Sequence, residues 1–296
     1  MSEPILAESD APETERGTTS AMPWALTGLS LAVLMPSLDT SIANASLPAM
    51  AQAFNASFQE VQWIVLAYLL AITTLIVGAG RLGDMFGRRR LLLAGIVLFT
   101  AASLLCGVAT TLWMLVTARV AQGLGAAIMM ALAIAFVGDT VPNAKTGSAM
   151  GILGTMSAVG TTLGPSLGGL LIARVGWGAI FLINVPFGIL TFLLGHRYLP
   201  ADRQNQNQKP TTFDAVGTML LALALAAYAL AMTIGHGQFS QLNIALILAA
   251  VCGAGLFILV EARIASPLIQ LATFHDPVLS SGLMTSALVS TVMMAT

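Results

Sequence analysis

The sequence predicts an all-α integral membrane protein built as a bundle of about nine transmembrane helices. Of its 296 residues, 57% are hydrophobic and only 8% are charged, whereas about a quarter of the residues in a soluble domain are charged. Long apolar runs follow one another, and a bilayer core of roughly 30 Å requires about 20 helical residues to cross. A short link that is rich in arginine, residues 80–90, separates two of these runs.

The chain begins with a polar, acidic segment, residues 1–23, which lacks the basic start and apolar centre of a signal peptide. We expect it to be a disordered cytoplasmic tail. The apolar runs then predict membrane spans at 24–46, 61–82, 91–108, 112–137, 146–172, 177–198, 213–234, 242–260 and 279–296. The last run reaches Thr296 without a flanking charge, so we expect the chain to be truncated at its C-terminal side.

The basic residues predict the orientation, because short cytoplasmic loops carry an excess of lysine and arginine. Link 80–90 is therefore expected in the cytoplasm, together with the N-terminus. Counting spans from that link puts one basic residue outside, Arg174. The cytoplasmic side receives Arg16, Arg81, Arg88, Arg89, Arg90, Lys145, Arg197, Arg203, Lys209 and Arg263. This asymmetry predicts a multi-pass protein of the plasma (inner) membrane.

Two charges fall well inside predicted spans, Asp39 in the first and Arg119 in the fourth. Each lies about seven residues from the outer end of its helix, which is roughly 10 Å below the surface. Equal depth allows them to pair. One interpretation is a structural salt bridge. The other is a carboxylate that gains and loses a proton, because a nearby arginine favours its ionised form and burial favours its neutral form. Gln122 lies on the same helix face as Arg119, where it could hydrogen-bond the guanidinium or a ligand.

Glycines recur at every fourth position in the fifth span, at Gly160, Gly164 and Gly168. Such a ridge allows another helix to approach closely. Pro165 removes a backbone hydrogen bond and predicts a bend. Together with Pro165 and Gly169, the ridge predicts a helix that bends against a partner. The alternative is simple tight packing. Asn184 and Pro186 give the sixth span a similar feature.

Several segments are similar to motifs of one family. Residues 80–89 look like the loop motif between helices two and three of the major facilitator superfamily, although Met85 stands where the family usually has a basic residue. Residues 38–48 look like the first-helix motif of its fourteen-helix drug:proton antiporter branch. Residues 119–123 and 160–169 resemble its fourth-helix and fifth-helix motifs, the latter associated with antiporters. The resemblance covers roughly residues 24–290.

This resemblance implies a major facilitator-type bundle with nine of an expected fourteen helices. The parts would be an N-terminal six-helix bundle (24–198), a cytoplasmic linker (199–212), two extra helices (213–262), and a cytoplasmic loop with the start of the C-terminal bundle (263–296). A second chain is a possible source of the missing bundle. The loop motif would form a cytoplasmic gate latch, consisting of Gly80, Arg81, Asp84, Gly87, Arg88 and Arg89.

We therefore expect a secondary active transporter that exports small amphipathic compounds or drugs by proton antiport and alternating access. Asp39 and Arg119 would couple the proton, and Gln122, Asn44 and Asn184 would line the substrate pathway. The fifth-helix residues Gly160, Gly164, Pro165, Gly168 and Gly169 would form a bendable contact. No enzyme motif, cofactor, metal site or nucleic-acid surface is expected; the partners are the substrate, protons and the bilayer. The alternatives are a proton-coupled importer of the same fold and a non-transporting receptor or regulatory subunit.

Overall fold

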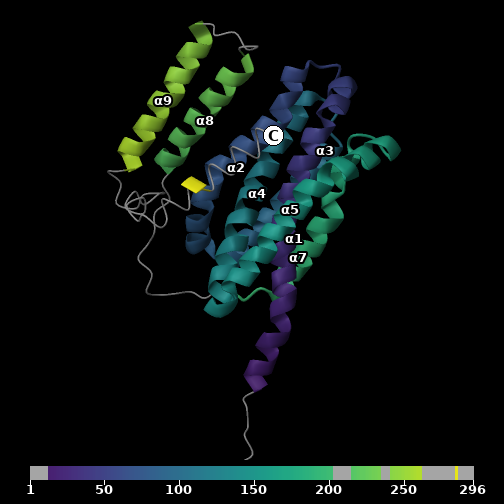
Figure 1. Cartoon of the computed structure of the whole chain (residues 1–296), viewed down its shortest axis with the longest axis vertical. Helices are drawn as coiled ribbons and strands as arrows, with labels where there is room; N and C mark the ends of the chain where they lie inside the picture. Colours follow the sequence, from purple (N-terminus) through teal and green to yellow (C-terminus); the bar gives the residue numbers. More distant parts are fainter. Residues whose placement is uncertain (1–12, 203–214, 235–240, 262–283, 286–296) are drawn as a thin grey trace, which may run out of the picture. The chain divides into compact units, whose positions relative to one another are not determined.

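The computed structural model describes residues 13–202, 215–234, 241–261 and 284–285 (Figure 1). The chain divides into two compact units, Met1–Lys209 and Pro210–Thr296, which we call the first and second units. The described parts contain nine helices: α1 (Glu13–Phe54), α2 (Phe58–Phe86), α3 (Arg88–Gly107), α4 (Leu112–Thr140), α5 (Asn143–Arg174), α6 (Ala179–Leu182), α7 (Asn184–Tyr198), α8 (Ala215–Ile234) and α9 (Gln241–Glu261).

The all-helical membrane fold is confirmed. Seven spans in the described part of the chain are long and apolar enough to cross a bilayer, six in the first unit and Gln241–Val260 in the second. The apolar stretch of α8, Val216–Ala231, is shorter. The span expected at 279–296 lies outside the described residues, apart from positions 284 and 285.

The structure differs from the sequence prediction at three helix ends. Helix α1 begins at Glu13, so residues 13–23, which we expected in a disordered tail, are helical. The membrane span within this helix begins at Met22. Link 80–90 is not an irregular loop, since α2 continues to Phe86 and α3 begins at Arg88. Gly87 alone makes the turn, with φ of 94°, a conformation that glycine adopts without steric cost.

The third difference lies in the sixth span, which is two helices instead of one. Helices α6 and α7 are interrupted at Ile183. Pro186 occupies the first turn of α7, where a missing N–H leaves no hydrogen bond unmade. The interruption places Asn184 at the start of α7, and its side chain is buried.

Helices α1 and α5 pack side by side in the first unit (Figure 1). A Cβ atom at Gly160 would lie 2.8 Å from the Leu34 carbonyl oxygen, and one at Gly164 would lie 2.9 Å from the Ile42 nitrogen. Gly168 faces Ile42 as well. These three glycines form the predicted ridge. Gly169 does not belong to it, because a Cβ atom there would meet nothing within 4 Å among the described residues.

Reciprocal contacts join the start of α3 to the end of α7. The Asp202 carboxylate accepts hydrogen bonds from the backbone N–H groups of Arg89 (2.7 Å) and Arg90 (3.2 Å), and so caps α3 from a distant part of the chain. In return, the Arg89 guanidinium donates to the carbonyl of His196 in the last turn of α7. A Cβ atom at Gly87 would lie 2.6 Å from Cγ of Asp202, so this approach requires glycine.

The core of the first unit consists of two apolar clusters with a polar layer between them. One cluster takes Leu29–Met35 from α1 and Ala126–Val137 from α4. The other takes Leu38–Met50 from α1 and Leu115–Ala118 from α4. Arg119 and Gln122 lie on α4 between the two sets, so the polar side chains are sealed by apolar packing along the helix axes.

In the second unit, α8 and α9 pack against each other. A Cβ atom at Gly253 would lie 3.1 Å from Cβ of Ala224, which shows how closely the two backbones approach. The buried side chain of Asn243 donates to the carbonyl of Ala231 (3.0 Å). Both contacts are of the kind that joins helices in a bilayer, where small and polar residues replace the hydrophobic effect as the source of association.

Candidate functional site

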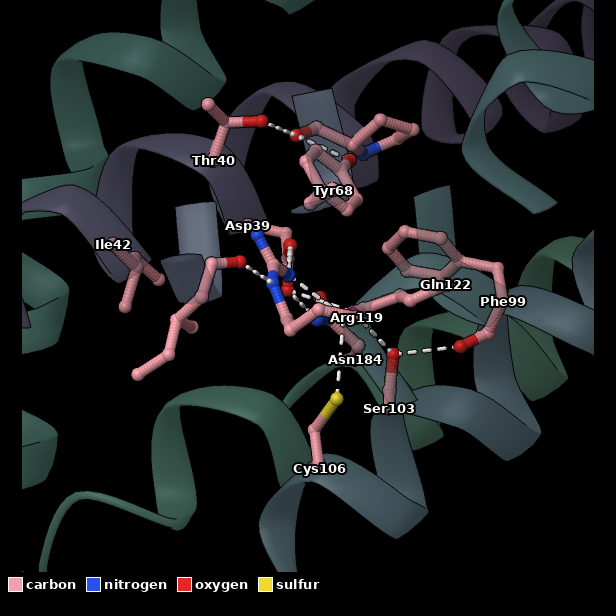
Figure 2. Close-up of polar contacts among 12 residues, drawn as sticks. Asp39, Thr40, Ile42, Tyr68, Phe99, Ser103, Cys106, Arg119, Gln122 and Asn184 are labelled. Atoms are coloured by element: carbon pink, nitrogen blue, oxygen red, sulfur yellow. Dashed lines mark hydrogen bonds and ion pairs between the residues drawn. The ribbon is translucent and has the colours of Figure 1, made fainter. Parts of the chain in front are cut away.

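Asp39 and Arg119 form an ion pair in the centre of the first unit (Figure 2). Nη1 of Arg119 donates to Oδ2 of Asp39. Relative exposure is 1% for the carboxylate side chain and 0% for the guanidinium. The pairing expected from their equal depth is therefore confirmed. Both charges have been removed from water and from lipid, which costs several kcal/mol per ion unless partners compensate.

The second oxygen of the Asp39 carboxylate is bound by two side-chain amides. Nε2 of Gln122 donates to Oδ1 at 2.9 Å, and Nδ2 of Asn184 donates to the same atom at 2.7 Å (Figure 2). The three donors to Asp39 come from α4 and α7, whereas the carboxylate is carried by α1. Charge-assisted hydrogen bonds are the stronger kind, so the ionised carboxylate ties three helices together.

Arg119 is held on several sides. Its Nε donates to the Ile64 carbonyl of α2 (3.1 Å), and its Nη1 also donates to Oε1 of Gln122 (2.7 Å). Cζ lies 3.9 Å from the ring centroid of Tyr68 and 5.5 Å from that of Phe181, which provides cation–π attraction. Nη2 is buried and has no hydrogen-bond partner among the described residues.

A further layer of polar groups orients Gln122. Nε2 of Gln122 also donates to Oγ of Ser103 (2.8 Å), which in turn donates to the Phe99 carbonyl (2.7 Å). The buried Cys106 thiol lies 3.5 Å from Oε1 of Gln122. Helix α3 thus contributes to the network without touching the ion pair. Asp39, Arg119, Gln122, Asn184 and Ser103 are called the polar network below.

Sequence reasoning assigned Gln122, Asn44 and Asn184 to a substrate pathway. The structure instead places Gln122 and Asn184 against the Asp39 carboxylate. Asn44 is apart from both; it is exposed and donates to the Thr40 carbonyl one turn earlier in α1 (3.0 Å). Any contact of these three residues with substrate stays a prediction. Ser103 and Cys106 were missed, because neutral polar residues in an apolar helix give little signal.

The residues of the loop motif lie at the junction of α2 and α3. Asp84 and Arg88 form an exposed ion pair of 2.8 Å, four residues apart. Arg89 bonds to α7, as described above, and Gly80 faces open space. Contact of these residues with a second bundle stays a prediction. Among the described residues, no three His, Cys, Asp or Glu side chains come together as a metal site.

The fold and the site define a class: a helical membrane protein whose interior holds a paired acid and base sealed from lipid. Comparison with known proteins then gives the family. The chain belongs to the major facilitator superfamily, whose sequence pattern matches residues 29–296. That superfamily is a family of membrane transporters.

The chain is similar to several drug efflux proteins. It is 37% identical over 253 residues to the multidrug resistance protein Stp of Mycobacterium tuberculosis, covering 84% of this chain and 46% of that protein. It is 35% identical to the tetracenomycin C resistance and export protein of Streptomyces glaucescens, covering 88% of this chain and 48% of that protein.

The chain is also similar to two transporters that are not named for drug resistance or drug export. The riboflavin transporter RibZ of Clostridioides difficile is 36% identical over 204 residues, covering 69% of this chain and 44% of that protein. A bacterial homologue of the human lysosomal transporter Spinster, solved inward-facing and occupied, has a TM-score of 0.54 at 20% identity and covers 84% of this chain and 63% of that one. This likeness shows the fold alone. The chain spans about half the length of the curated relatives it matches.

Proposed function

We propose that this chain belongs to a secondary transporter that exports small amphipathic compounds in exchange for protons, with Asp39 as the proton-binding group. The observation that supports this most directly is the burial of the Asp39 carboxylate together with its three side-chain donors. An ionisable residue at membrane depth is costly and usually has a function in ion or substrate movement. The similarity to drug efflux proteins supports export.

The charges of the site suggest how proton binding would drive movement. With Asp39 ionised, the pair is neutral, and α1, α4 and α7 are held together by its hydrogen bonds. Protonation of Asp39 would leave the Arg119 charge uncompensated in a dry site, which is unfavourable by several kcal/mol. The helices would then separate until water reaches the guanidinium. This change would alternate access between the two sides of the membrane.

The role of Asp39 is tested by the substitution Asp39→Asn, which keeps the size of the side chain and removes its charge. We expect substrate-driven proton movement in proteoliposomes to fall to background, because an amide cannot exchange the proton. The matched control is Glu60→Gln, an acid-to-amide change at an exposed helix cap. Glutamine also serves in that capping position, so the control should transport normally.

Unchanged proton movement in the folded Asp39→Asn protein would contradict the mechanism.

The direction of transport requires a separate experiment. In inside-out vesicles whose lumen is acidified, an exporter accumulates substrate and an importer does not. The same proposal includes the gate latch of residues 80–90 and the cytoplasmic N-terminus.

A further inference from the structure

Two hydrogen bonds link α1 to α5 on the face of α1 that lies against the glycine ridge. Oγ of Ser37 lies 2.8 Å from Oγ of Ser157. One turn later, the hydroxyl of Ser41 donates to the backbone carbonyl of Thr161 at 2.6 Å. The second bond is unusual, because a carbonyl in the middle of a helix normally accepts from the N–H group four residues further on.

The Thr161 carbonyl lacks that partner because residue 165 is proline. Pro165 lies inside α5 and has no N–H group to donate. Thr161 lies within the membrane span Ala144–Arg174, where no water can bond to a free carbonyl, and each unsatisfied backbone group there costs several kcal/mol. The Ser41 hydroxyl supplies the missing donor from the neighbouring helix. Its approach requires a glycine at position 164, since a Cβ atom there would overlap the Ser41 side chain.

The same segment of α1 carries Asp39. Ser37 and Ser41 share one face of α1, and Asp39 lies two residues from each, about 200° around the helix. One face of this turn therefore bonds to α5, and the opposite face bonds to Arg119 on α4 and Asn184 on α7. A movement of α5 at Pro165 would displace the Thr161 carbonyl and, through the bond to Ser41, the turn that holds Asp39.

We infer that Ser41 is a positioning residue for Asp39: its hydroxyl replaces the N–H group that Pro165 lacks and so couples α5 at this proline to the proton-binding site. The inference rests on the proposed function for the role of Asp39. The bond between Ser41 and Thr161 does not depend on transport, so it can be tested in the purified chain whether or not that chain transports.

The test is a double-mutant cycle of Ser41→Ala and Pro165→Ala, because alanine at 165 restores the N–H group. The readouts are the melting temperature in detergent and the rate at which dicyclohexylcarbodiimide modifies Asp39, a reaction of protonated carboxyls in apolar sites. With Pro165 present, Ser41→Ala should lower the melting temperature. It should also raise the modification rate by about threefold to tenfold, the range expected for one lost hydrogen bond. With Ala at 165, both effects should disappear.

The matched control is Ser46→Ala. Ser46 lies on the same helix, is buried and donates to the Ile42 carbonyl within α1 (2.6 Å), so its removal should have equal effects with and without Pro165. Equal effects of Ser41→Ala in both backgrounds would overturn the inference. A change in melting temperature without a change in Asp39 modification would also overturn it, because the bond would then be structural only. Normal proton movement in the Asp39→Asn protein would instead contradict the proposed function. The double-mutant cycle would still report whether the bond between Ser41 and Thr161 positions Asp39.

Discussion

The Asp39 carboxylate is bound on both oxygens, and its partners differ in kind. Arg119 supplies a full charge, whereas Asn184 and Gln122 supply neutral amides. Asn184 has a special position, because it begins α7 directly after the interruption at Ile183. The site therefore combines a fixed charge on the long helix α4 with an amide on a helix end, where small movements cost less than in a continuous helix.

Replacing Asn184 by alanine should weaken the network without removing the ion pair. The lost bond to a charged acceptor corresponds to about 1.5–3 kcal/mol, and we expect the melting temperature of the purified protein to fall. Asn184→Asp should have a larger effect, since it places a second carboxylate beside Asp39 in a buried site. An equal effect of the two substitutions would show that Asn184 does not contact the carboxylate.

The ion pair and the bond between Gln122 and Arg119 were predictable, whereas the amide contacts with the Asp39 carboxylate were not. Asp39 and Arg119 are charges in apolar helices, and their depth follows from counting residues. Asn184 was noted for its proline neighbourhood, but its contact with Asp39 depends on the rotation of α7. The sequence of a membrane helix says little about how the helix is rotated about its own axis, because lipid-facing and buried positions are both apolar. Asp202 was missed for another reason: it lies in a polar link, 113 residues from the Arg89 N–H group that it caps.

At the scale of elements, α1 and α5 pack closely because α5 has glycines where the two helices meet. The glycine spacing predicted a close approach but did not say which helix would approach, and the structure identifies α1. Pro165, where the sequence predicts a bend, lies within a helix that continues from Asn143 to Arg174. The bonds from Ser37 and Ser41 then join the two helices side by side.

Gly164→Ala should therefore destabilise the first unit. The added Cβ atom would lie 2.9 Å from the Ile42 nitrogen and would overlap Ser41, and overpacking of this kind costs about 1–3 kcal/mol. Gly151→Ala on the same helix is the control, because a Cβ atom there would meet nothing within 4 Å in the described part of the chain and alanine favours helix. The melting temperature should fall for Gly164→Ala and stay or rise for Gly151→Ala. The opposite order would contradict the packing of α5 on α1.

At the scale of the molecule, the distribution of basic residues predicts which side of the membrane each helix end faces. Helix α5 offers a matched pair for this test, because Lys145 lies in its first turn and Arg174 at its end, and both are exposed. At about 1.5 Å per residue, the 32-residue helix is long enough to reach both faces of a bilayer. We therefore expect the two ends to face opposite compartments.

Cysteine labelling can determine which side of the membrane each end faces. The two variants are Lys145→Cys and Arg174→Cys, each combined with Cys252→Ser to remove the exposed native thiol. A membrane-impermeant maleimide added to intact cells should label the protein with cysteine at 174 and not the one with cysteine at 145. Permeabilised cells should give labelling of both. The chain with Cys252→Ser alone measures the background from the buried Cys106. Labelling of the cysteine at position 145 in intact cells would show that the chain has the opposite orientation in the membrane. Residues 80–90 would then face outward, and a cytoplasmic gate latch at that position would be excluded.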